Sequence, residues 1–132
     1  MKKQLFIALM FFALPVSAGQ QSSAREYAET VNTYVNKWIK SKYPNNPQLG
    51  SPEQYIEQGE MWYQTGVKLK EVDLKEKKVS NDFKRESTLS QVYEACQDST
   101  IDNTAMLGSI VATKAIIKAC IKTVMDGYEA GE

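Results

Sequence analysis

Histidine is missing from all 132 residues of this chain. Its absence excludes Ser-His and Cys-His nucleophilic sites, imidazole metal ligands and the usual side-chain switch near neutral pH. Cysteine is almost as scarce, because Cys96 and Cys120 are the only 2. They stand 24 residues apart, which matches neither a C-x-x-C redox motif nor a zinc knuckle. The common catalytic and metal-binding constellations are therefore lacking.

Other chemical motifs are equally hard to find. The sequence has neither the G-x-G-x-x-G pattern nor a P-loop, and Asp98 and Asp102 lack the alternating ligands and central glycine of a calcium loop. Glu53, Glu57 and Glu60 share one helix face and could support acid-base hydrolysis of a glycoside. Acidic residues early in a helix more often complement its dipole in water. We therefore predict a non-enzymatic protein with no catalytic residue, metal or cofactor. A carboxylate-dependent cell-wall hydrolase is a remote alternative.

Long apolar runs are lacking too, except for one at the N-terminus. Lys2 and Lys3 precede an uninterrupted apolar run over residues 5–14, and the small residues at 15–18 form a cleavage site of the A-x-A kind. A membrane-spanning helix needs about 20 apolar residues, so this run is too short to be an anchor. The pattern predicts a signal peptide over residues 1–18, a single domain over 19–132, a periplasmic location and no membrane span after cleavage.

Charge is balanced in the predicted mature chain. The signal segment carries 2 of the 16 basic residues and none of the 16 acidic ones, which leaves a net charge of −2. A basic surface is what nucleic acid and anionic membranes attract, so the balance argues against both as partners.

The 2 cysteines fall in the predicted mature chain. In an oxidising compartment an even number of cysteines indicates a disulfide, so we predict a Cys96–Cys120 bond within the chain. Two buried free thiols or a bridge between chains would satisfy the same spacing, and these alternatives stay open at this stage.

Apolar residues recur at spacings of three and four, which predicts an all-α fold: a bundle of about four helices with one disulfide. After a flexible lead, a capping box at Ser23 predicts a first helix that ends near Lys42. Loop residues follow, and Ser51 restarts a second helix through a capping box with Gln54. That helix contains two glycines, Gly59 and Gly66, which predict that another backbone packs closely against it.

The C-terminal half of the chain is harder to divide into helices and loops. Residues 67–86 fit either a helix or short strands, and their many Lys and Glu residues favour helix. A third helix is expected over 88–97 with Leu89, Val92, Tyr93 and Cys96 on one side, followed by a polar loop over 98–103. The last helix, over 104–128, carries a lysine stripe that should face water at Lys114, Lys118 and Lys122.

This arrangement conflicts with the disulfide. Cys96 would adjoin the loop, whereas Cys120 would lie about 24 Å along the last helix from its start. A tight hairpin could not then join the sulfurs. Either the loop runs back along the bundle, or the last helix breaks near Gly108 and Ser109.

Partner binding is the function that these features favour. Tyr43, beside a Pro-Asn-Asn-Pro loop, is the best candidate for an exposed aromatic, and Tyr is common in binding hot spots. The residues predicted to contact a partner are Tyr43, Glu53, Glu57 and Glu60. We expect a periplasmic protein that binds another protein, as an inhibitor or immunity protein against a secreted effector or as an accessory of an envelope assembly. An ATP-independent stress chaperone is the alternative.

Three short segments at or near the cysteines carry a resemblance. The segments 93–97 (YEACQ), 119–120 (AC) and 126–128 (DGY) together resemble the paired-cysteine pattern of small periplasmic immunity proteins that neutralise type VI secretion effectors. The chain departs from that pattern just after the second cysteine, where Lys122 and Thr123 stand in place of Gly-Tyr. The resemblance implies an immunity function and does not extend to the rest of the chain.

Overall fold

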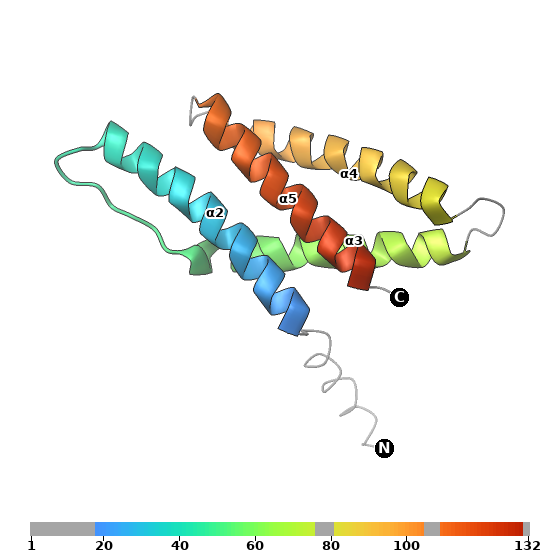
Figure 1. Cartoon of the computed structure of the whole chain (residues 1–132). Coiled ribbons are helices and arrows are strands. Elements are labelled where there is room, and N and C mark those ends of the chain that lie inside the picture. The colour runs from blue at the N-terminus through green and yellow to red at the C-terminus, as the bar shows by residue number, and fades with distance from the viewer. Residues whose placement is uncertain (1–17, 76–80, 105–108, 131–132) are drawn as a thin grey trace, which may run out of the picture.

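Helices make up nearly all of the described chain. This computed structural model describes residues 18–75, 81–104 and 109–130. The elements are α2 (Ala18–Lys42), the 3₁₀ helix η1 (Pro52–Tyr55), α3 (Ile56–Lys75), α4 (Asn81–Thr104) and α5 (Ile110–Ala130) (Figure 1). These ranges contain no strand, which confirms the predicted all-α class. Helix is also confirmed over 67–75 and 81–86, while 76–80 fall outside the described residues.

The first helix begins earlier than predicted. Residues 19–22 are helical, so the flexible lead and the capping role of Ser23 were wrong. The Ser23 hydroxyl instead donates a hydrogen bond to Asp126 Oδ2 of α5 at 2.9 Å. Gln20 is buried and its Oε1 accepts a 2.6 Å hydrogen bond from Gln64 Nε2 of α3. Tertiary contacts therefore hold this turn in helix, which local capping signals do not show.

The restart of the chain after the loop follows the prediction. The predicted capping box of Ser51 and Gln54 is present, and in it the Ser51 amide donates to Gln54 Oε1 at 3.1 Å. The Asn36 side chain bonds Gly50 twice, accepting from its amide at 2.8 Å and donating to its carbonyl at 3.1 Å. These bonds tie the end of the loop back to α2, so that η1 and α3 start from a fixed point.

Helix α3 crosses α2 and α5 at glycines, where the backbones touch. A Cβ atom at Gly59 would lie 2.7 Å from the carbonyl oxygen of Ala24 in α2. One at Gly66 would overlap the Val124 carbonyl oxygen of α5, and one at Gly127 would overlap the Tyr63 carbonyl oxygen of α3. Close backbone packing at Gly59 and Gly66 is thus confirmed. Gly127 of α5 makes the same kind of contact with α3, which the sequence analysis did not predict.

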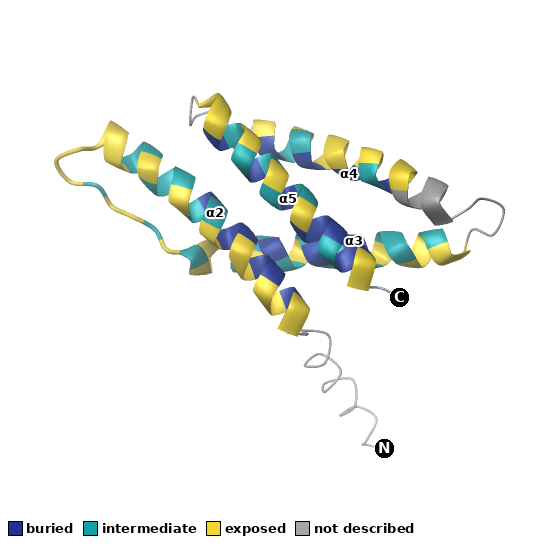
Figure 2. Ribbon diagram, in the orientation of Figure 1, coloured by how far each residue is buried: buried dark blue, intermediate teal, exposed yellow. Residues whose placement is uncertain are grey.

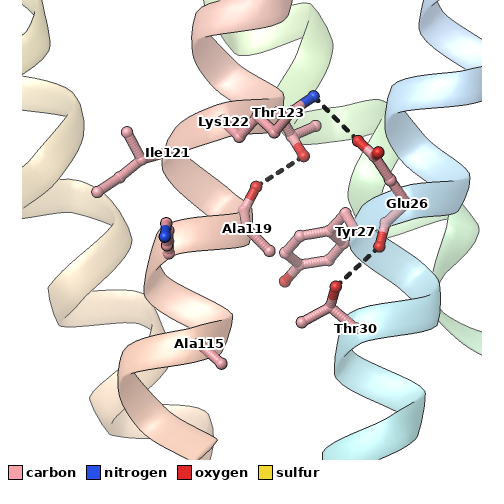
Figure 3. A pocket seen from close by; sticks show the side chains of 9 residues that line it. Glu26, Tyr27, Thr30, Ala115, Ala119, Ile121, Lys122 and Thr123 are labelled. Atoms are coloured by element: carbon pink, nitrogen blue, oxygen red, sulfur yellow. Dashed lines mark hydrogen bonds and ion pairs between the residues drawn. The ribbon is translucent and has the colours of Figure 1, made fainter.

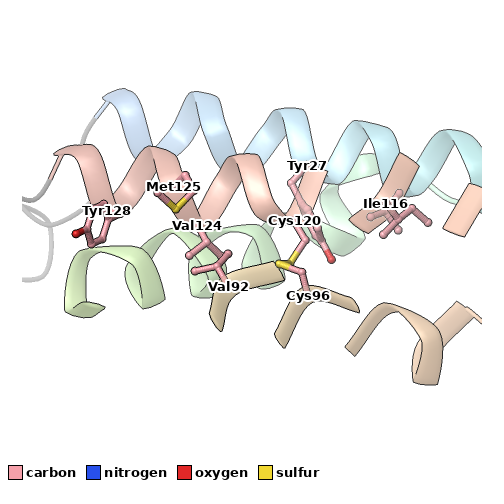
Figure 4. Close-up of a cluster of buried hydrophobic side chains, with 9 residues drawn as sticks. Tyr27, Val92, Cys96, Ile116, Cys120, Val124, Met125 and Tyr128 are labelled. Atoms are coloured by element: carbon pink, nitrogen blue, oxygen red, sulfur yellow. A yellow bond between two sulfur atoms is a disulfide. The ribbon is translucent and has the colours of Figure 1, made fainter. Parts of the chain in front are cut away.

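The predicted disulfide is present, but the helices that carry it differ from the prediction. Cys96 of α4 and Cys120 of α5 are bonded, with their Cα atoms 5.8 Å apart (Figure 4). Residues 98–103 continue α4 as helix, so the predicted loop was wrong, and α5 starts at Ile110 instead of Thr104.

These bounds remove the conflict with a hairpin. Cys96 lies about 12 Å from the end of α4 and Cys120 about 15 Å from the start of α5, so antiparallel packing brings the two level. The expectation that a hairpin could not pair them was therefore wrong. The alternative of a break near Gly108 and Ser109 agrees with the start of α5, where Ser109 Oγ accepts the Ala112 amide at 3.2 Å.

The core lies where α5 meets the other three helices. Buried residues gather at these crossings, whereas the outer faces of α2 and α4 are exposed (Figure 2). Tyr93 was expected on the buried side of its helix, but it is half-exposed because Val92 and Cys96 occupy that side. The main cluster is Tyr27, Val31, Val92, Cys96, Ile116, Cys120, Val124, Met125 and Tyr128. None of the helices over the described ranges is long and apolar enough to cross a membrane.

One carboxylate joins three helices beside this core. Asp73 Oδ2 of α3 accepts hydrogen bonds from Thr88 Oγ1 of α4 at 2.7 Å and from Tyr128 Oη of α5 at 2.6 Å. The Lys70 ammonium lies 4.4 Å from the centre of the Tyr128 ring, within cation–π range. This network fixes the start of α4 against α3, to which it otherwise has few contacts.

Candidate functional site

The candidate site is a groove between α2 and α5. The two helices run antiparallel, and a hollow of about 520 Å³ lies between them (Figure 3). Ala115 and Ala119 of α5 line it opposite Tyr27 and Thr30 of α2. Because alanines four residues apart lie on the same helix face and fill little space, the helices leave this hollow open. Burial raises the pKa of the Tyr27 phenol, so its ring contributes a neutral, largely apolar surface.

Charged residues close one end of this hollow. The Lys122 ammonium lies 2.9 Å from Glu26 Oε1 and 3.0 Å from Asp126 Oδ2. Asp126 also accepts the bond from Ser23, so the four side chains link α2 to α5. Hydrogen bonds to Glu26 and Asp126 raise the pKa of Lys122, which keeps it charged. Since Lys122 and Glu26 are largely exposed and Asp126 is partly exposed, their ion pairs add little to the stability of the fold.

The other end is open and apolar. A second hollow of about 390 Å³ follows along the same pair of helices, with Trp38 of α2 and Val111 of α5 in its lining. Val111 is 69% exposed and its neighbour Ile110 is 73% exposed. We call the two hollows together the α2/α5 groove. It is lined by Glu26, Tyr27, Thr30, Tyr34, Lys37, Trp38, Ser41, Ser109, Val111, Ala112, Ala115, Lys118, Ala119, Ile121, Lys122 and Thr123.

Lysines line the groove at Lys37 and Lys118, and Lys114 stands one helical turn before Lys118 on α5. Lys37, Lys114 and Lys118 are exposed, which confirms that the lysine stripe of α5 faces water. None of the three forms an ion pair with another residue in the described ranges. The sequence over 30–52 and 109–125 contains no acidic residue, so no nearby carboxylate from these segments offsets the charge.

None of the predicted partner-contacting residues lines the groove, although Tyr43 contacts Trp38, which does. Tyr43 is half-exposed just beyond α2, and its ring meets the Trp38 ring edge-on at 6.4 Å between centroids. Glu53, Glu57 and Glu60 lie on η1 and α3 and line neither hollow.

Glu53 is engaged in a different contact. Its Oε2 lies 2.9 Å from Arg25 Nη2, and this hydrogen bond lowers the pKa of Glu53. A glycosidase acid needs a raised pKa, so the shift runs against the role of proton donor. The carboxylate instead links η1 to α2.

We expect the titration of Glu53 to depend on Arg25. Replacing Arg25 by Gln removes the guanidinium, and the pKa of Glu53 should return toward its ordinary value of 4.5. In the unaltered protein, the contribution of the pair to stability is complete above that value. It is lost as the pH falls through the lowered pKa. NMR of the side-chain carboxyl carbon measures the shift.

Arg25→Lys is the matched variant, since it keeps the positive charge but loses the planar fork. It should leave the pKa of Glu53 between those of the unaltered and Gln proteins. Identical titration curves for all three proteins would contradict the contact.

No metal site is evident among the described residues. They contain no group of three or more His, Cys, Asp or Glu side chains placed to hold one. The expectation of no cofactor therefore remains a prediction. The groove itself was missed from the sequence, although its signal was present: Ala115 and Ala119 repeat at four residues beside the lysine stripe.

Comparisons with known proteins do not place the chain in a family. Protein-family models, curated proteins and solved structures were each compared with it, and none matches.

Proposed function

We propose that this protein binds another protein through the α2/α5 groove, in the periplasm and without catalysing a reaction. The observation that carries the proposal is an apolar groove with a small-residue floor that no described segment covers. From Val111 to Thr123 it extends for about 18 Å, the length of three helical turns. A groove of this kind suits the docking of an amphipathic helix, whose apolar side chains occupy successive hollows.

Neighbouring features support a binding role. Trp38 and Tyr43 form an aromatic pair at the open end, and such residues dominate binding hot spots. Ile110 and Val111 present apolar area that folding leaves in water. Such a protein would act as an inhibitor or immunity protein against a secreted effector, or as an accessory of an envelope assembly. The cysteine resemblance favours the immunity role.

Filling the groove should abolish partner binding. Ala119→Trp places a large ring in the 520 Å³ hollow, where it excludes a docked helix without replacing a fully buried residue. We expect recovery of the partner from periplasmic extract to fall by about tenfold or more, as for the loss of a hot spot. Affinity capture followed by mass spectrometry measures the recovery.

Ala95→Trp is the control, because Ala95 is exposed on α4 and does not line the groove. It should recover the same partner as the unaltered protein. Circular dichroism of both variants checks that they fold. Equal recovery with Ala119→Trp, or no specific partner for the unaltered protein, would refute the proposal.

A further inference from the structure

The outer face of α4 carries a second pattern of unpaired groups. Glu94 and Asp98 are exposed and stand four residues apart, so they lie on one side of the helix. Neither forms an ion pair with another residue in the described parts of the chain. Tyr93 and Ile101 beside them are 51% and 47% exposed. This face is therefore that of an acidic, amphipathic helix, and its side chains are exposed among the residues that the structure describes.

The groove rim has the complementary pattern. Lys114 and Lys118 of α5 are also exposed and four residues apart, and neither forms an ion pair with another described residue. Lys118 lines the groove, and Lys114 precedes it by one turn of the same helix. One helical spacing of four residues is about 6 Å, so two carboxylates on one helix can face two ammonium groups on another. Tyr93 and Ile101 offer apolar side chains for the hollows next to the lysines. Charge and apolar pattern thus match between the two surfaces.

Within a single copy the two surfaces cannot meet. The inner face of α4 is held on α5 by the disulfide and by Val92, so the outer face points away from the groove of the same chain. We propose that α4 of a second copy docks along the α2/α5 groove, with Glu94 and Asp98 facing Lys114 and Lys118. This inference does not depend on the identity of any partner, although a partner in the groove would compete with the second copy.

Charge exchange between two variants tests the contact. The first variant carries Lys114→Glu and Lys118→Glu, and the second carries Glu94→Lys and Asp98→Lys. Each alone places like charges at the interface, so we expect its dissociation constant for self-association to rise by about tenfold or more. In an equal mixture the charges are complementary again, and association should return to the level of the unaltered protein.

Sedimentation equilibrium of protein purified from periplasmic extract measures the association over a concentration series, at low salt because exposed charges are screened. The control is Lys68→Glu with Lys75→Glu, two exposed α3 residues, which changes the net charge equally and should leave association unchanged.

Two results would overturn the inference. One is a monomer at every concentration up to about 1 mM, which corresponds to a binding free energy weaker than about −4 kcal/mol. The other is association of the unaltered protein without rescue in the mixture, which would place the contact elsewhere. Neither result bears on partner capture, which the Ala119→Trp variant tests separately.

Discussion

Replacing Gly66 by Ala should destabilise the protein by about 2 to 3 kcal/mol, the range of a core substitution that adds an atom without space for it. The added Cβ would overlap the Val124 carbonyl oxygen and lie 2.7 Å from the Tyr128 amide nitrogen. Both are backbone atoms of α5, so no side-chain rotation relieves the overlap and the helices must separate. Alanine is the better helix former by up to about 1 kcal/mol, which offsets only part of this cost.

Urea unfolding followed by circular dichroism measures the loss. Gly50→Ala is the comparison variant and should cost less, because the nearest atom to its Cβ is the end of the flexible Gln54 side chain, whose movement loses only the hydrogen bond to the Ser51 amide. Gly127→Ala should behave like Gly66→Ala, since it disturbs the same crossing from the other helix. A Gly66→Ala protein as stable as the unaltered one would show that α3 and α5 do not touch at this point.

Reducing the disulfide should lower the free energy of unfolding by about 3 to 4 kcal/mol in the chain-entropy model. The bond closes a loop between residues 24 apart, and reduction returns conformational freedom to the unfolded chain. For a domain of this size the melting temperature should fall by about 10 to 25 °C. Thermal unfolding with and without a reducing agent measures the change.

The double variant Cys96→Ala with Cys120→Ala controls for side effects of the reductant. It should melt near the reduced protein, somewhat lower because the sulfur atoms are also lost from the core. Its melting temperature should not respond to the reductant. A change of only a degree or two on reduction, or free thiols in protein from the periplasm, would contradict the predicted bond.

Much of the fold could be predicted from the sequence, because the patterns that indicate its helices involve residues close together in the chain. The apolar spacing of α2, the link between Ser51 and Gln54, and the glycines of α3 all depend on near neighbours or on one residue type. The predictions were wrong where contacts between residues far apart in the sequence determine the local structure. Ser23 looks like a cap but bonds α5, and polar residues over 98–103 resemble a loop although Thr100 is buried and the segment is helical.

The site was harder to predict for the same reason. The exposure of Tyr43 could be predicted because this residue adjoins a loop. The groove could not, because it is formed by two helices that are far apart in the sequence. Ala115 and Ala119 become a floor only when α2 lies beside them. The contact of Glu53 with Arg25 could not be foreseen either, because Arg25 belongs to another helix.

The Cys96–Cys120 disulfide fixes the position of α4 along α5. A helix joined to its neighbour at one point near its middle cannot slide along it by a turn, but it can still tilt about that point. The Thr88–Asp73 hydrogen bond holds α4 a second time, about 12 Å from Cys96 along the axis. Two fixed points set the direction of the α4 axis. Because both contacts are made by buried residues on the inner side of the helix, they also limit its rotation about that axis, so its carboxylates at Glu94 and Asp98 keep facing away from α5.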